Sequence, residues 1–295
     1  MPVAPITNII LQGQPVDVLR LELAYPELQG NKHFKLKYNL QRMIREGYKT
    51  VLTFGGVFSN HIHATAVACH ALGIRSVGVF RGENDPNNPT LQHVRNLGME
   101  CIFIDRSLYR KRNDPSFAES LAAQFEQTYV LPEGGTNTLA IKGCTEILSG
   151  LETAYDLVVC AVGTGGTLSG LINTPGLTAE VLGISALKSE KDVLSPAVLA
   201  NVSEEAAAVQ WQILFDNSIG GYGAYHEELM SYIRAFEQTH AMLPDPIYTA
   251  KMFFVVEKLI KAQQYQGKRI LCIHTGGLQG WAGWNYRYHT QMRIP

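Results

Sequence analysis

Short apolar runs alternate with stretches of helical periodicity along almost the whole chain. Runs rich in β-branched and other apolar residues predict strands over residues 16–23, 51–54, 75–80, 100–105, 156–161, 181–186 and 269–274. Apolar residues three and four positions apart, with helix start and stop signals, predict helices over residues 32–46, 59–72, 91–97, 227–238 and 247–264. This alternation predicts an α/β fold of open, twisted parallel sheets that helices cover on both faces.

The predicted elements divide into two groups. The best internal boundary lies near Pro132, where prolines and glycines interrupt the periodic segments. We expect the first strand and helix to pack with the C-terminal half of the chain. The sequence therefore predicts a large domain formed by residues 1–45 and 139–295, and a small domain formed by residues 46–138.

Charge and composition exclude several classes of partner. The formal net charge is −1 and the sequence pI is about 6.8, which gives no reason to expect binding to nucleic acid or to a membrane surface. The N-terminus lacks the layout of a signal peptide, and no apolar run is long enough to span a bilayer. Five cysteines lie far apart and mostly within apolar runs, so we expect buried free thiols and a cytoplasmic location.

The most informative residue is Lys32, within the segment GNKHFK of residues 30–35. A Gly-Asn turn precedes the predicted helix, so Lys32 and Lys35 lie near its start, where the helix dipole disfavours positive charge. Cations in this place need a compensating anion, such as a cofactor phosphate. An amine in such a setting also tends towards a lowered pKa, which a lysine that forms a Schiff base requires. The alternative is an ordinary surface lysine.

A glycine-rich loop follows the strand predicted at residues 156–161. Its sequence is Gly163-Thr164-Gly165-Gly166-Thr167. Its backbone N–H groups can converge on an anion at the start of the next helix, so we interpret it as a phosphate-binding loop. The alternative, a tight turn between strand and helix, does not need three glycines and two threonines. The loop matches neither a Walker loop nor a dinucleotide fingerprint, because no Lys-Ser/Thr pair ends it and the glycine spacing differs.

Two further segments carry neutral hydrogen-bonding groups. Ser59, Asn60 and His61 begin a predicted helix, where they could bind a small carboxylate, and Asn60 could also reach a phenolic oxygen. The alternative is a capped helix with nothing bound. Tyr248 could stack on a flat ring while Thr249 reaches its edge, although such a tyrosine more often belongs to the core or an interface. No metal site is expected, because His61 and His63 are two positions apart, whereas a pair of metal-binding histidines on a helix is four apart.

Together these segments resemble the pyridoxal-phosphate enzymes of the tryptophan synthase β fold type. They look most like the family of 1-aminocyclopropane-1-carboxylate deaminases and D-cysteine desulfhydrases. That family carries Gly-Asn-Lys-x-x-Lys, Gly-Gly-x-x-Ser-Asn, a glycine phosphate loop, Asp-Pro-x-Tyr and a C-terminal Gly-Gly. All five motifs occur here in this order between Gly30 and Gly277, so the resemblance covers most of the chain. It implies pyridoxal 5′-phosphate as the cofactor, a small amino acid as the substrate, and a homodimer.

The resemblance also implies roles for the matching residues. Lys32 would form the Schiff base and later move the α-proton of the substrate. The other catalytic residues would be Ser59, which shuttles a proton, Tyr222 and Tyr248. The cofactor would be held by Lys35, Asn60, Gly163, Thr164, Gly165, Gly166, Thr167, Tyr248, Thr249 and Thr275. The substrate would be bound by Ser59, Asn60, His61 and Tyr222.

The chain departs from the deaminases of this family in ways that bear on its chemistry. Thr249 replaces a glutamate and Thr275 replaces a leucine, and both hydroxyl residues match the desulfhydrase-like members. A carboxylate keeps the pyridine nitrogen protonated and makes the ring a strong electron sink, whereas a threonine supplies a neutral hydrogen bond. His61 stands where a glutamine is usual, which leaves substrate choice open. The N-terminal segment is shorter than in the family, and residues 19–23 stand where a Lys-Arg-x-Asp run is usual.

A weaker electron sink favours α,β-elimination over the opening of a cyclopropane ring. We therefore expect a pyridoxal-phosphate-dependent lyase that converts D-cysteine, or a relative such as β-chloro-D-alanine, to pyruvate and ammonia. D-Cysteine would also release sulfide. The alternatives within enzymes are a 1-aminocyclopropane-1-carboxylate deaminase and a β-replacement synthase. Outside enzymes, the alternative is a non-catalytic phosphate-ligand binding protein of the same fold.

Overall fold

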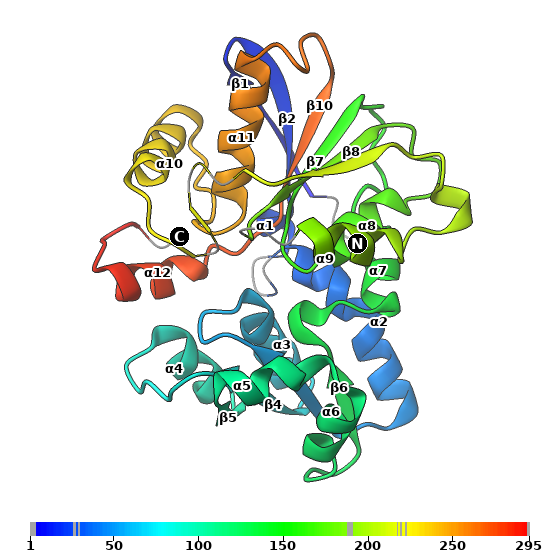
Figure 1. The fold of residues 1–295 in the computed structure, drawn as a ribbon, viewed down its shortest axis with the longest axis vertical. Coiled ribbons are helices and arrows are strands. Elements are labelled where there is room, and N and C mark those ends of the chain that lie inside the picture. Colours follow the sequence, from blue (N-terminus) through cyan, green and yellow to red (C-terminus); the bar gives the residue numbers. More distant parts are fainter. Residues whose placement is uncertain are drawn as a thin grey trace. The chain divides into compact units, whose positions relative to one another are not determined.

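A computed structural model describes residues 4–25, 28, 30–187, 191–216, 218, 220–221 and 223–293 of the chain (Figure 1). They form two compact units. The first unit consists of residues 1–31 and 144–278, and the second of residues 32–143 and 279–295. The sequence predicts a large domain of residues 1–45 and 139–295 and a small domain of residues 46–138. This division stays a prediction, because the compact units are defined by packing alone.

The first unit is built on a six-stranded sheet with the strand order β1-β2-β10-β7-β8-β9. Its elements are β1 (Ile6–Leu11), β2 (Gln14–Arg20), α1 (Leu21–Ala24), β7 (Leu157–Val162), α8 (Gly166–Ile172), β8 (Glu180–Ser185), α9 (Lys191–Leu199), η3 (Glu204–Ala206), β9 (Trp211–Leu214), α10 (Glu227–His240), α11 (Thr249–Lys261) and β10 (Ile270–His274). Every neighbouring pair of strands is parallel except β1 and β2. These two form a hairpin whose turn residues, Gln12 and Gly13, have φ angles of 49° and 81°.

Helices cover both faces of this sheet. Leu182 and Ile184 of β8 point to one face and pack in a core that includes Phe253 and Val256 of α11. Gly183 points to the other face, where a Cβ atom would lie 2.8 Å from Leu168 of α8. Since alternate residues of a strand face opposite sides of the sheet, α11 and α8 lie on opposite faces. The predicted parallel sheet with helices on both faces is confirmed for this unit.

The second unit contains a four-stranded parallel sheet with the strand order β5-β4-β3-β6. Its elements are α2 (Asn31–Glu46), β3 (Thr50–Gly55), α3 (Asn60–Ala71), β4 (Arg75–Arg81), α4 (Pro89–Asn96), β5 (Glu100–Ile104), α5 (Arg106–Tyr109), η1 (Arg110–Asn113), α6 (Pro115–Ala122), β6 (Thr128–Leu131), η2 (Glu133–Gly135), α7 (Thr138–Cys144) and α12 (Gly280–Tyr288). Val77 and Val79 of β4 pack against α5 and α6, whereas Phe80 packs against α3 and α4. This sheet is therefore also covered on both faces.

Several predicted boundaries differ from the structure. The strand expected over residues 16–23 ends at Arg20, because Leu21–Ala24 form the short helix α1. The helix expected over residues 247–264 is α11, which starts at Thr249 and ends at Lys261. Cys69, Cys144, Cys160 and Cys272 are buried free thiols as predicted, and Cys101 is a half-buried one. Among the helices of the described residues, none is long and apolar enough to cross a membrane.

Candidate active site

The glycine loop lies between β7 and α8 of the first unit and is held at both ends. Gly165 adopts φ +84°, which positions the following N–H groups at the start of α8. A Cβ atom on Gly163 would lie 3.1 Å from the ring of Tyr248, so this ring packs directly on the loop. At the other end, the side-chain amide of Asn31 donates a hydrogen bond of 2.9 Å to the hydroxyl of Thr167. The structure thus brings together the predicted phosphate loop, the predicted stacking tyrosine and the residue that precedes Lys32.

Tyr248 and Thr249 are positioned by the buried carboxylate of Asp245. One oxygen accepts hydrogen bonds from the backbone N–H groups of Ile247 and Tyr248, at 3.0 and 2.8 Å. The other accepts from the backbone N–H of Thr249 at 2.8 Å and from its hydroxyl at 2.7 Å. The Thr249 hydroxyl also accepts from the backbone N–H of Asp245. Thr249 is fully buried and its only hydroxyl proton is used, whereas Thr275 is 7% exposed.

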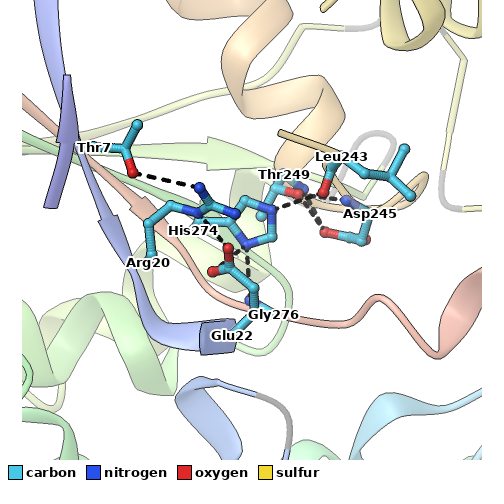
Figure 2. A network of polar contacts seen from close by, with 8 residues as sticks. All are labelled: Thr7, Arg20, Glu22, Leu243, Asp245, Thr249, His274 and Gly276. Carbon is cyan, nitrogen blue, oxygen red and sulfur yellow. Dashed lines mark hydrogen bonds and ion pairs between the residues drawn. The ribbon is translucent and has the colours of Figure 1, made fainter. Parts of the chain in front are cut away.

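A polar network surrounds His274, the residue before Thr275 (Figure 2). Glu22 accepts from Arg20, and its second carboxylate oxygen lies 3.0 Å from Nδ1 of His274. The other ring nitrogen of His274 donates to the carbonyl of Leu243 at 3.2 Å, because a carbonyl can only accept. Burial alone would raise the pKa of Glu22, but attraction by His274 and Arg20 outweighs burial and lowers it. The network therefore ties β2 and the end of β10 to the segment before α11.

The backbone of Thr275 in turn holds the start of the Lys32 helix. Its carbonyl accepts a hydrogen bond from the N–H of Asn31 at 3.1 Å. The same carbonyl oxygen would lie only 2.3 Å from a Cβ atom on Gly30, which also has φ +67°. Glycine is therefore required at position 30, both by its backbone conformation and by the close approach of Thr275. The predicted Gly-Asn turn before Lys32 is thus fixed by the end of the last strand.

In the second unit, Lys32 is partly buried and Lys35 is almost fully buried. The ammonium of Lys35 donates to the carbonyl of Gly134 and, at 2.8 Å, to the hydroxyl of Thr136. These partners belong to the Pro132–Asn137 loop, whose Gly134 and Gly135 both have positive φ. A phosphate contact of Lys35, which the resemblance implies, stays a prediction.

Ser59, Asn60 and His61 form the start of α3. The hydroxyl of Ser59 caps the helix by accepting from the N–H of Ile62 at 3.3 Å, as predicted. Asn60 is 9% exposed, and its side-chain oxygen accepts a hydrogen bond of 2.8 Å from the amide of Gln279. These residues belong to one unit with Lys32, whereas Tyr222 lies outside the described residues.

His61 is held in one tautomer by a short chain of hydrogen bonds. The Thr53 hydroxyl donates to the carbonyl of Leu131 at 2.8 Å, so Nε2 of His61, 2.8 Å from that hydroxyl, must carry a proton and donate. Nδ1 is buried and has no hydrogen-bond partner among the described residues. Burial, with repulsion from Lys35 and Lys32, lowers the pKa of His61 well below 6.5. The side chain of His61 can therefore accept a hydrogen bond at Nδ1 but has no second proton to donate.

We expect His61 to remain the neutral Nε2–H tautomer at pH 6.5, where an ordinary histidine is half protonated, because its pKa lies well below that value. Long-range ¹H–¹⁵N correlation spectra distinguish the two tautomers and the imidazolium. The His61→Gln variant identifies the signal by removing it. A doubly protonated ring at neutral pH would contradict this assignment.

Sequence reasoning assigned no role to five residues that shape these sites. They are Glu22, Thr53, Asp245, His274 and Gln279. Asp245 had a local signal, since an aspartate before Pro-x-Tyr-Thr can cap the helix that follows. The others act through partners far away in the sequence, and local spacing carries no sign of such contacts. Among the described residues, no group of three or more histidines, cysteines, aspartates and glutamates is placed to bind a metal.

Comparisons with known proteins show the family of the chain. The sequence model of the family described as "Pyridoxal-phosphate dependent enzyme" matches residues 17–276. A protein of Pyrococcus abyssi named "Putative 1-aminocyclopropane-1-carboxylate deaminase" is 31% identical over 286 residues, which cover 91% of this chain and 86% of that protein. A D-cysteine desulfhydrase of Klebsiella pneumoniae (strain 342) is 28% identical over 288 residues, which cover 90% of this chain and 87% of the relative.

Solved structures show the same fold. The crystal structure of an ACC deaminase homologue superimposes with a TM-score of 0.82 at 28% identity, covering 96% of this chain and 92% of that one. A hydrogen sulfide-producing enzyme from Fusobacterium nucleatum superimposes with a TM-score of 0.67 at 18% identity, covering 94% and 96% of the two chains. The second likeness concerns the fold alone.

Proposed function

Because the chain belongs to the family of pyridoxal-phosphate-dependent enzymes, we propose that it is a lyase that eliminates the β-substituent of a small amino acid. D-Cysteine is the proposed substrate, and with one water it gives pyruvate, ammonia and hydrogen sulfide. The named relatives include both a D-cysteine desulfhydrase and 1-aminocyclopropane-1-carboxylate deaminases, so the choice between these reactions rests on the residues of this chain.

The residues present fit the cofactor. In the first unit, the glycine loop offers backbone N–H groups to a phosphate, and Tyr248 presents its ring beside that loop. In the second unit, Lys32 supplies the amine, and Asn60 supplies an amide for the oxygen of the ring. Bound pyridoxal phosphate supplies an aldehyde that joins amines as a Schiff base and a ring that withdraws electrons from the α-carbon.

The choice of elimination rests on the neutral groups available to the ring nitrogen. Thr249 is fully buried with its proton bonded to Asp245, and Thr275, which is also buried but retains 7% exposure, is the hydroxyl that we assign to the ring edge. A hydroxyl does not stabilise a charged ring nitrogen as a carboxylate does, so the ring is a weaker electron sink. Such a ring suits removal of an α-proton next to a good leaving group better than the opening of a cyclopropane ring.

In the proposed reaction, Lys32 first holds the cofactor and then removes the α-proton from the substrate. Ser59 returns a proton, and the backbone N–H groups at the start of α3 bind the substrate carboxylate together with Ser59 and Asn60. The neutral His61 cannot donate from Nδ1. We therefore propose that Nδ1 accepts a hydrogen bond from a donor group of the substrate and does not bind the substrate carboxylate. We further propose a homodimer and a cytoplasmic location, which the family resemblance and the free thiols support.

A substrate panel tests this proposal. D- and L-amino acids, β-chloro-D-alanine and 1-aminocyclopropane-1-carboxylate are incubated with the holoenzyme, and release of 2-oxo acid and sulfide is measured. We expect pyruvate and sulfide from D-cysteine at a rate well above that for L-cysteine. 2-Oxobutyrate from the cyclopropane substrate would support the deaminase instead. Turnover that appears only with an added nucleophile would indicate a β-replacement synthase, and a colourless, inert protein would indicate a binding protein.

A further inference from the structure

The helix α12 lies outside the part of the chain that the family model matches, yet it contacts the start of α3. Gln279, which precedes α12, donates from its side-chain nitrogen to the side-chain oxygen of Asn60 at 2.8 Å. Two glycines on the same helix allow this approach. A Cβ atom on Gly280 would lie 3.5 Å from that oxygen of Asn60, and one on Gly283 would lie 2.4 Å from the ring of Phe58.

The direction of the Gln279–Asn60 hydrogen bond follows from which side-chain amide atoms remain without a hydrogen-bond partner. When Gln279 donates, its side-chain oxygen is buried without a hydrogen-bond partner among the described residues. If both amides were turned around, an NH₂ group with two donors would occupy that buried place instead. Buried donors without acceptors are rarer in proteins than carbonyls with unused lone pairs. The orientation in which Gln279 donates and Asn60 accepts is therefore favoured.

We propose that Gln279 is a positioning residue that fixes the amide of Asn60 with its NH₂ group turned towards the cofactor. With its oxygen bonded to Gln279, Asn60 can present only donors on its other side, and a donor is what a negatively charged ring oxygen requires. This inference rests on the proposed function, because it takes Asn60 as the partner of that oxygen. It gives α12 a part in cofactor chemistry without any contact of its own with the cofactor.

The pKa of the Schiff base reports the orientation of Asn60. A donor on the ring oxygen stabilises its negative charge, weakens its hold on the neighbouring Schiff-base proton and so lowers the pKa of that proton. The pKa is read from the visible absorption of the holoenzyme as a function of pH. In Gln279→Glu the new side chain has the same length but can only accept, so it turns the Asn60 amide around. We expect the Schiff-base pKa to rise by about one unit, the size expected for one hydrogen bond to a charged group.

Three further variants complete the test. Gln279→Met keeps the length without any hydrogen bond, and should raise the pKa less than Gln279→Glu does; it also serves should Gln279→Glu fail to fold. Asn60→Ala removes the donor itself, so it gives the full rise in the Schiff-base pKa that loss of this donor causes. Tyr286→Phe removes a hydrogen bond between α12 and Asp85, 2.8 Å long, and should leave the pKa unchanged.

The outcomes separate the two proposals. A raised pKa in both Gln279 variants and in Asn60→Ala supports the positioning role. A raised pKa in Asn60→Ala, with wild-type values in both Gln279 variants, overturns the role of Gln279 and leaves the proposed function intact. A wild-type pKa in Asn60→Ala removes Asn60 from the ring oxygen, and the positioning role falls with that assignment. An equal shift in Tyr286→Phe would show that the pKa follows the packing of α12, which also overturns it.

Discussion

Lys32→Ala is expected to lose the Schiff-base absorption completely and to reduce 2-oxo acid formation by roughly 10³-fold or more, because one residue carries both the covalent link and the proton transfer. The variant is freed of loose cofactor by gel filtration, and its visible spectrum and activity are then measured. Alanine is a good helix former, so α2 itself should be retained.

Lys37→Ala is the matched control, since Lys37 lies on the same helix as Lys32. It should keep the colour and most of the activity. A Schiff-base spectrum that survives in Lys32→Ala after gel filtration would show that another amine holds the cofactor. A spectrum lost equally in both variants would point to damage to α2 rather than to the role of Lys32.

Glu22→Gln is expected to lower the free energy of unfolding by about 3 kcal/mol at pH 7, which is typical when one partner of a buried ion pair is removed. The amide cannot balance the charge of Arg20, and its NH₂ group faces the donors of that guanidinium. Urea unfolding of both proteins measures the loss. The exposed pair of Glu46 with Arg42 provides the control, and Glu46→Gln should change the stability very little.

The stability difference should depend on pH in a definite direction. The folded-state pKa of Glu22 lies below its ordinary value of 4.5. Its stabilising contribution is therefore fully present above pH 4.5 and is lost as the pH falls through the lowered folded-state pKa. Glutamine does not titrate, so the gap between wild type and Glu22→Gln should narrow in acid. A gap that widened below pH 4.5 would contradict the charged pair.

The features that could be predicted from the sequence are those set by local backbone chemistry. Ser59 caps α3 as predicted, because capping needs only a hydroxyl three residues before an N–H. The glycine loop follows a buried strand as predicted, because positive φ at Gly165 leaves a glycine signature. In both cases the residues that produce the structure and the sequence pattern that predicts it lie within a few positions of each other.

The features that could not be predicted depend on distant partners. Arg20 and Glu22 look like the polar positions of a continuing strand, and nothing nearby shows that Glu22 turns inward to meet His274. The hydrogen bond between Asn60 and Gln279 spans 219 positions. The hairpin of β1 and β2 was missed because its apolar residues show no clean alternation before Gly13.

The second unit is formed by two segments that are far apart in the sequence, and this affects the order in which its parts are synthesised. Residues 32–143 of this unit leave the ribosome first, and α12 follows only after residues 144–278 of the first unit have been made. A nascent chain therefore carries Asn60 without Gln279 until residues 144–278 have been made. Domains generally fold as units during translation, so we expect the second unit to pass through a stage in which the start of α3 is uncovered. Cofactor capture with a correctly turned Asn60 then becomes an event that follows the synthesis of α12.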